Sequence, residues 1–242
     1  MERAPDAPAE SLGNRLMLQG TTLLAGDSMT VGLAPFVKID GEIRTIAAVG
    51  RTAAQLLEAL QASSATEGAK NLIVLIGAND IGGAPSVDRI FQTIADTWSF
   101  GKRQGMKVFA LTIPPNKGWA GFASNFPAVN SRRKAINAKI LASHIPDQIV
   151  DLDRLTADPS DPDALSKTFD SGDHLHPRKD ALGALLTKIL AAGPGTVVSP
   201  TSAQDVVASG VQIPVGTIAL AAALVFGLRA ATRTRFYKRT FA

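Results

Sequence analysis

The feature that most constrains this chain is a series of short apolar runs that alternate with longer segments of helical character. The clearest run, residues 71–76, is continuous, rich in β-branched side chains and ended by Gly77. Continuous runs of this kind are typical of parallel strands that are covered on both faces. Strands that alternate with helices usually join one parallel sheet through right-handed crossovers. The pattern therefore predicts an α/β fold in which helices cover both faces of a parallel sheet.

The other predicted elements continue this alternation along the chain. Further strands are expected at residues 21–25, within 42–49, and at 107–113 and 148–152. Helices are expected at residues 53–62, 87–104, 131–143 and 178–191. Thr52 and Ser86 stand directly before the first two helices, where a hydroxyl can cap free backbone N–H groups. Residues 116–127 and 158–172 are predicted to be loops.

Length and residue usage narrow the kinds of function that the chain can have. Its 242 residues are enough for one α/β domain with an appendage. The absence of cysteine excludes disulfides, thiolate zinc sites and a cysteine nucleophile. Because the whole chain has three histidines, a histidine-rich metal site is not expected.

The basic character of the chain is confined to its C-terminus. The net charge is +4. The last segment has no acidic residue and carries Arg229, Arg233, Arg235, Lys238 and Arg239. These positive charges exceed the net charge of the whole chain, so the remainder is close to neutral. We therefore expect no nucleic-acid partner for the main domain.

Four short blocks of polar and glycine residues follow strand ends or lie on a late loop. In chain order they are Gly26-Asp27-Ser28, Gly50, Gly77-Ala78-Asn79-Asp80 and Asp173-His174-Leu175-His176. In open parallel sheets, functional groups lie beyond the carboxyl ends of the strands. The blocks supply a nucleophile, a base, a carboxylate and hydrogen-bond donors, which are the groups that acyl transfer requires. Together they predict a hydrolytic site at that edge of the sheet.

The same blocks resemble the four signature blocks of the SGNH hydrolases, also called GDSL-type esterases and lipases. Met29 extends the first block, and Pro177 follows the last. The resemblance covers about residues 21–192 and implies a three-layer α/β/α fold with a parallel, flavodoxin-like sheet. Met29 stands where a leucine is common in the family, which is a nearly isosteric apolar exchange.

The resemblance also implies a role for each block. Ser28 would be the catalytic nucleophile, His176 the base that takes its proton, and Asp173 the carboxylate that orients the imidazole. The oxyanion hole would consist of the backbone N–H groups of Ser28 and Gly50 and the side-chain amide of Asn79. Such a site needs no metal and no cofactor.

Each of these assignments has a simpler structural alternative. Ser28 could cap the next helix, and Gly50 could be a plain turn glycine. Asn79 could serve only to form its turn. Asp27 and Asp80 are expected to be structural, hydrogen-bonding the turns that hold the serine and the asparagine.

The last block contains a second histidine that competes for the role of base. His174 is nearer to Asp173 in the sequence, but the family pattern places the base three residues after the aspartate, at His176. His174 occupies a position where the family often has glycine. Its ring could line the substrate pocket or perturb the titration of His176. His144 is expected to be a helix-end or surface histidine.

Substrate contacts are expected from the loop at residues 116–127. Trp119, Phe122 and Phe126 are candidate walls of an acyl or sugar site, together with His174. The alternative is a surface loop that is packed by its own aromatic side chains.

The chain ends are expected to lie outside the hydrolase-like domain at residues 21–192. Residues 1–20 form a short lead-in without the features of a secretory signal. Residues 193–210 are rich in Gly, Pro, Ser and Thr and are predicted to be a linker. Residues 211–228 have no charge, and with the flanking residues they are long enough for a membrane-spanning helix. Residues 229–242 form the basic tail.

The membrane prediction leaves the topology open. The basic tail is expected on the cytoplasmic side, which favours an extracytoplasmic or virion location for the domain. No export signal supports that location, and a tail-anchored protein would keep the domain in the cytoplasm. The alternative for residues 211–228 is a buried apolar helix that mediates self-association.

The sequence therefore predicts a serine esterase or deacylase that forms an acyl-enzyme on Ser28. The expected substrates are lipid esters, short-chain esters or O-acetylated glycans. The competing hypothesis is a membrane-anchored structural, assembly or receptor-binding protein, for example of a viral particle, that uses the hydrolase fold as a scaffold. Homo-oligomer or particle assembly is compatible with either hypothesis.

Overall fold

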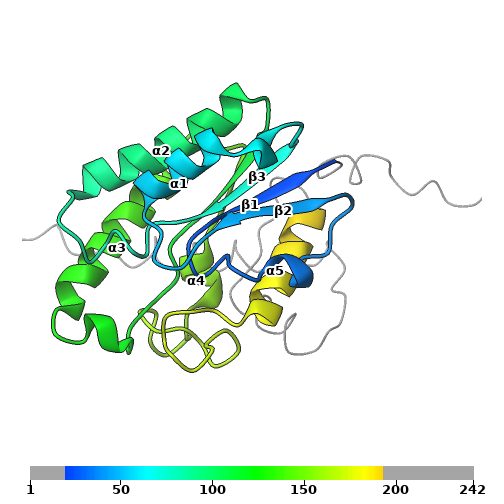
Figure 1. The fold of residues 1–242 in the computed structure, drawn as a ribbon. Coiled ribbons are helices and arrows are strands. Elements are labelled where there is room, and N and C mark those ends of the chain that lie inside the picture. Colours follow the sequence, from blue (N-terminus) through cyan, green and yellow to red (C-terminus); the bar gives the residue numbers. More distant parts are fainter. Residues whose placement is uncertain (1–19, 193–242) are drawn as a thin grey trace, which may run out of the picture.

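A parallel five-stranded sheet forms the centre of the domain. The computed structural model describes residues 20–192 (Figure 1). The strands are β1 Thr22–Gly26, β2 Ile43–Ala47, β3 Asn71–Leu75, β4 Lys107–Leu111 and β5 Gln148–Val150. Their order across the sheet is β2-β1-β3-β4-β5, and neighbouring strands pair in parallel. Gly26 pairs with Ala47 and Leu75, so the carboxyl ends of these strands lie at one edge.

Helices cover both faces of the sheet, which confirms the predicted α/β/α architecture. They are α1 Ala53–Ala62, α2 Val87–Arg103, α3 Phe126–Leu141, α4 Leu152–Thr156 and α5 Lys179–Ala192. Short 3₁₀ turns lie at Ala34–Phe36, Ser64–Thr66 and Ala120–Phe122. Figure 1 shows α1 and α2 side by side on one face of the sheet and α5 on the other.

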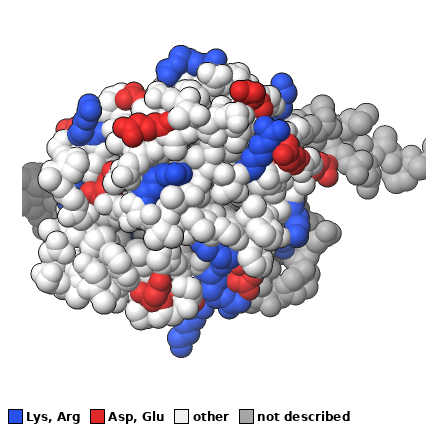
Figure 2. Space-filling model, in the orientation of Figure 1, with Lys and Arg blue, Asp and Glu red and all other residues white. Residues whose placement is uncertain are grey.

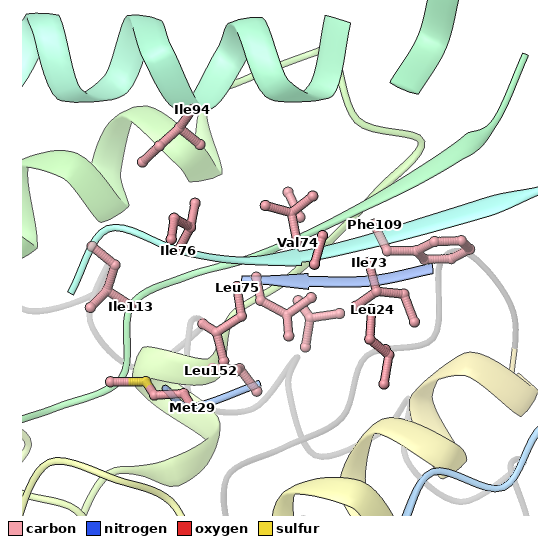
Figure 3. Packing of buried hydrophobic residues seen from close by; sticks show 14 of the residues in the cluster. Leu24, Met29, Ile73, Val74, Leu75, Ile76, Ile94, Phe109, Ile113 and Leu152 are labelled. Carbon is pink, nitrogen blue, oxygen red and sulfur yellow. The ribbon is translucent and has the colours of Figure 1, made fainter. Parts of the chain in front are cut away.

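The central strands are buried on both faces, as their continuous apolar sequences predict. Every residue of β1 and β3 is buried. Successive side chains at the end of β3 point to opposite faces of the sheet. Leu75, the last residue of the strand, lies on the side of Leu152, whereas Ile76, the next residue, points toward Ile94 of α2 (Figure 3). Met29 packs in this second layer and is buried, as expected for an apolar exchange with leucine.

The predicted helix caps are present. The Thr52 hydroxyl accepts a hydrogen bond from the Gln55 N–H at 3.4 Å, and the Gln55 side chain accepts one from the Thr52 N–H at 3.0 Å. This reciprocal pair is a capping box. The Ser86 hydroxyl accepts from the Arg89 N–H at 3.2 Å and begins α2.

Two strands end earlier than predicted, β4 at Leu111 and β5 at Val150, and two helices beyond β4 differ from the prediction. The predicted start of α3 at residue 131 is wrong, because the helix begins at Phe126. Pro127 lies in its first turn, where a missing N–H costs nothing, so the proline does not end the loop as expected. The short helix α4 was not predicted. It begins at Leu152 and is capped by Asp151, whose carboxylate accepts from the Arg154 N–H.

The buried face of α3 carries an arginine network as well as apolar side chains. Arg133 is 0% exposed and donates to the Asn130 side-chain oxygen at 2.9 and 3.0 Å. It also pairs with Asp153 of α4 and, at 3.3 Å, with Asp163 of the loop before α5. A further bond reaches the carbonyl of Ile113 at the end of β4. This one side chain therefore ties α3, β4, α4 and the late loop together.

We expect replacement of Arg133 by methionine to lower the free energy of unfolding by about 3–5 kcal/mol, because two partly buried carboxylates lose their pairing with the buried guanidinium. Urea denaturation would measure the loss. The matched control is Lys134→Met, since Lys134 is 53% exposed and pairs with the same Asp163 at 2.7 Å. That change should cost no more than about 1 kcal/mol. Equal losses in both variants would contradict the importance assigned to the buried network.

Charges of both signs are interspersed on the surface shown in Figure 2. Exposed side chains form ion pairs within this mixture, including Lys102 with Asp147 at 2.7 Å and Lys117 with Asp161 at 2.6 Å. Within residues 20–192, no helix combines the length and the apolarity needed to cross a bilayer. The predicted lead-in, linker, membrane helix at residues 211–228 and basic tail lie outside the described residues, and they stay predictions.

Candidate active site

The turn after β1 holds Ser28 in a defined position. The Asp27 carbonyl accepts from the N–H groups of Thr30 at 3.0 Å and Val31 at 3.2 Å. The buried Asp27 carboxylate accepts from the Met29 N–H at 2.9 Å. This agrees with the predicted structural role of Asp27. The turn leaves the Ser28 side chain partly exposed at the carboxyl edge of the sheet.

Three side chains from opposite ends of the domain meet at this edge. Ser28 Oγ lies 2.8 Å from His176 Nε2, and His176 Nδ1 lies 2.5 Å from Asp173 Oδ2. The other oxygen of Asp173 accepts from the N–H groups of Leu175 at 2.9 Å and His176 at 2.8 Å. The structure therefore brings the predicted nucleophile, base and orienting carboxylate into one hydrogen-bonded chain.

The surroundings of Asp173 favour its ionised form. Partial burial alone would raise its pKa. The hydrogen bonds from the His176 N–H and imidazole and from the Leu175 N–H outweigh burial, so they hold the pKa of Asp173 well below its usual range. Asp173 is therefore ionised at every pH at which His176 is expected to act as a base.

His174 belongs to a second, separate aspartate–histidine pair. Its Nδ1 lies 2.6 Å from Asp170 Oδ2, and its N–H donates to Asp170 Oδ1 at 3.0 Å. The φ of His174 is +64°, a left-handed conformation that explains why glycine suits this position. The ring lies against Gly118, where a Cβ would be 3.0 Å from His174 Cγ. His174 thus contacts the loop after β4, and His176 is the histidine that reaches Ser28.

The two remaining blocks form adjoining turns. The Arg51 N–H bonds to the Ala48 carbonyl at 3.3 Å, and Gly50 inside this turn has a φ of +72°. A Cβ at Gly50 would meet nothing within 4 Å, so backbone conformation and not crowding favours glycine here. Asn79 is exposed and donates one amide hydrogen to the Arg51 carbonyl at 3.1 Å. Its second amide hydrogen has no acceptor within residues 20–192.

The backbone N–H groups of Ser28 and Gly50 have no hydrogen-bond partner in the part of the chain that the structure describes. β1 and β2 pair in register, and the Ala48 N–H bonds to the Gly26 carbonyl, so the two turns leave the same edge of the sheet. Both N–H groups therefore lie on turns at the sheet edge that also carries the Ser28 hydroxyl.

Two buried carboxylates lie beneath the site. Asp80 accepts from the Ala53 N–H at 3.0 Å, so it anchors the start of α1 and not only its own turn, and burial raises its pKa. Burial also raises the pKa of Asp27 to about 6, against the opposing effects of the Met29 N–H, His176 and a nearby lysine. Asp27 Oδ2 has no hydrogen-bond partner among residues 20–192.

The aromatic side chains of the loop after β4 mostly pack against the protein. Trp119 and Phe122 meet edge to face, with ring centroids 4.5 Å apart. Phe122 is buried and also lies against Gly82, where a Cβ would be 2.9 Å from the ring. These contacts fit the alternative of a loop packed by its own aromatics. Phe126, at the start of α3, and Trp119 stay partly exposed.

Lys179 is a site residue that the sequence analysis missed. It is the first residue of α5. Its Nζ donates to the carbonyls of Ser28 at 2.8 Å and Met29 at 2.7 Å. The only available signal was its place three residues after His176, since no motif marks it. His144, by contrast, is exposed just beyond α3, as predicted.

Within residues 20–192, no three His, Cys, Asp or Glu side chains are grouped closely enough to hold a metal ion.

Comparisons with known proteins identify the fold. No family model and no curated protein matches the sequence. Among solved structures, a GDSL-like lipase from Bacteroides thetaiotaomicron VPI-5482 superposes with a TM-score of 0.57 at 18% identity, covering 74% of this chain and 89% of that one. The lipase/acylhydrolase from Enterococcus faecalis gives a TM-score of 0.53 at 19% identity, covering 73% and 99%.

A third neighbour carries a different printed activity. An acetyl xylan esterase gives a TM-score of 0.54 at 14% identity, covering 71% of this chain and 98% of that one. The neighbours' chains are thus covered almost completely, whereas this chain extends beyond the match. The domain has the fold of the SGNH, or GDSL-type, hydrolases, in agreement with the resemblance of its four blocks.

Proposed function

We propose that this protein is a serine hydrolase that cleaves carboxylic esters through an acyl-enzyme on Ser28. The observation that carries the proposal is the hydrogen-bonded chain from Ser28 Oγ through His176 to Asp173, with distances of 2.8 and 2.5 Å. The fold alone would not require these three side chains to meet. The SGNH fold, and neighbours whose names include lipase, acylhydrolase and acetyl xylan esterase, support the same class of reaction.

The reaction would proceed in two acyl transfers. Ser28 Oγ attacks the ester carbonyl carbon while His176 Nε2 takes the serine proton. His176 then returns this proton to the leaving alcohol as the carbon–oxygen bond breaks, and the acyl group stays on Ser28. A water molecule next loses a proton to His176 and attacks the acyl carbon. The carboxylic acid leaves, and the proton returns to Ser28. Asp173 holds the imidazole and stabilises its charged form in both steps.

The negative charge on the carbonyl oxygen would be met by preorganised donors. The free N–H groups of Ser28 and Gly50 and the second amide hydrogen of Asn79 are the candidates. The bond from Asn79 to the Arg51 carbonyl orients the amide in advance, so it need not reorganise during the reaction. A single donor of this kind is worth about 10²–10³ in turnover.

The substrate belongs to the esters, and three classes are consistent with the site: short-chain esters, lipids and O-acetylated glycans. The names of the structural neighbours support lipid esters and O-acetylated sugars equally. If residues 211–228 form the predicted membrane helix, esters in a membrane or cell envelope are the favoured substrates.

The direct test combines hydrolysis with covalent labelling of the full-length protein. We expect the wild type to hydrolyse p-nitrophenyl acetate and to react with a fluorophosphonate probe. Mass spectrometry of the digested protein should then locate the probe on Ser28. Absence of both hydrolysis and labelling would contradict the proposal and favour the scaffold hypothesis.

A further inference from the structure

The turn at residues 27–31, called here the nucleophile turn, is hydrogen-bonded by two charged side chains, those of Asp27 and Lys179. Asp27 satisfies its N–H groups, accepting from Met29 through the carboxylate and from Thr30 and Val31 through the carbonyl. Lys179 satisfies its carbonyls, donating to Ser28 and Met29. Neither the bonds to Asp27 nor those from Lys179 involve the Ser28 N–H.

We propose that Lys179 is a positioning residue for the hydrolysis proposed above. Its ammonium binds the Ser28 and Met29 carbonyls and thereby keeps the serine hydroxyl on His176 and the serine N–H available to an oxyanion. The inference rests on the proposed function, because positioning has meaning only if Ser28 reacts.

The geometry of the contact supports this role. The two donor–acceptor distances, 2.8 and 2.7 Å, are those of short charge-assisted hydrogen bonds. The direction of a carbonyl depends on the ψ angle of its own residue, so two bonded carbonyls restrain ψ at Ser28 and at Met29. The contact joins residues 151 and 150 positions apart in the chain, which local turn formation alone would not bring together.

The same segment also carries the base. His176 lies three residues before Lys179, and the Arg178 N–H between them bonds to the Phe169 carbonyl at 2.6 Å. The nucleophile turn is therefore linked to this segment twice, through the His176 imidazole and through the Lys179 ammonium. A movement of the turn away from His176 would have to break the Lys179 bonds as well.

Lys179 also sets the charge around the turn. It is partly buried, and burial lowers its pKa while the charges of Asp27 and Asp173 oppose that effect. The charged groups that act on Asp27 are His176, Lys179 and Asp80, of which the first two lower its pKa and the third raises it. Loss of the ammonium would remove one of the two charges that lower the pKa of Asp27.

The test compares Lys179→Met with Arg178→Met in the full-length protein. Arg178 is the adjacent basic residue, and its side chain pairs with Asp180 and not with the turn. We expect Lys179→Met to lower kcat on the order of 10-fold to 100-fold with little change in KM, because the reacting atoms are misplaced after binding. Arg178→Met should leave both parameters close to wild type.

Two further measurements separate positioning from folding. Lys179→Arg, which can still donate to both carbonyls, should recover most of kcat. If circular dichroism shows that Lys179→Met is unfolded, Lys179→Leu provides the same comparison with a shorter neutral side chain that has no donor. A folded, neutral variant with wild-type kcat would overturn this inference alone. An inactive wild type that no fluorophosphonate labels would overturn the proposed function and the inference with it.

Discussion

Replacing Ser28 with alanine is expected to lower turnover of p-nitrophenyl acetate by about 10⁴-fold or more. The hydroxyl that lies 2.8 Å from His176 Nε2 would be missing, so no acyl-enzyme could form. The change removes one partly exposed oxygen at a position whose backbone is held by Asp27 and Lys179, so the fold should persist. Initial rates and fluorophosphonate labelling of purified wild type and variant would measure the effect.

Ser160→Ala is the matched control for this substitution. Ser160 is exposed, and within residues 20–192 it bonds only to Asp158 in its own loop. It should keep wild-type turnover and labelling. Comparable hydrolysis by the Ser28 variant would show that the activity comes from another group, and the assignment of the nucleophile would fail.

Most of the fold could be predicted because its signals are local in the sequence. The continuous apolar run of β3 reflects burial on both faces, and glycine marks its end. The Thr52 and Ser86 caps depend on neighbours three residues away. The start of α3 was harder to predict, because the buried face of this helix includes the polar Arg133 and is not a purely apolar stripe.

The candidate site was predictable only where its residues lie in recognisable blocks. Ser28, Asp173 and His176 stand in such blocks, and the choice between two histidines followed the family spacing. Lys179 has no motif, and its role depends on a contact with a residue 151 positions earlier. Periodicity and local spacing carry no information about such a contact. The same holds for Arg133, whose partners lie 20 and 30 residues away.

The late loop contains two aspartate–histidine pairs that are nearly alike in local geometry. Asp173 binds both the N–H and the ring of His176 at 2.8 and 2.5 Å, and Asp170 binds both the N–H and the ring of His174 at 3.0 and 2.6 Å. The two pairs differ in what each imidazole ring contacts on the side away from its aspartate. His176 Nε2 faces Ser28, whereas the ring of His174 lies against Gly118. The two pairs therefore offer an internal comparison.

Replacing Asp173 with asparagine is expected to lower kcat by about 10³–10⁴-fold, because the amide no longer selects the tautomer in which Nε2 accepts the serine proton. The loss should persist across the pH range above the depressed pKa of Asp173, since the wild-type side chain is ionised throughout that range. Measurement of kcat from mildly acidic to mildly basic pH would establish it.

Asp170→Asn makes the same chemical change in the second pair and should leave kcat within about threefold of wild type, because His174 is not expected to carry a proton of the reaction. Both variants keep an oxygen that can accept the loop N–H groups, so their folded fractions should match. A larger loss in Asp170→Asn than in Asp173→Asn would transfer the role of base to His174. Equal and small losses would mean that neither carboxylate orients a catalytic imidazole, and the triad would have to be abandoned.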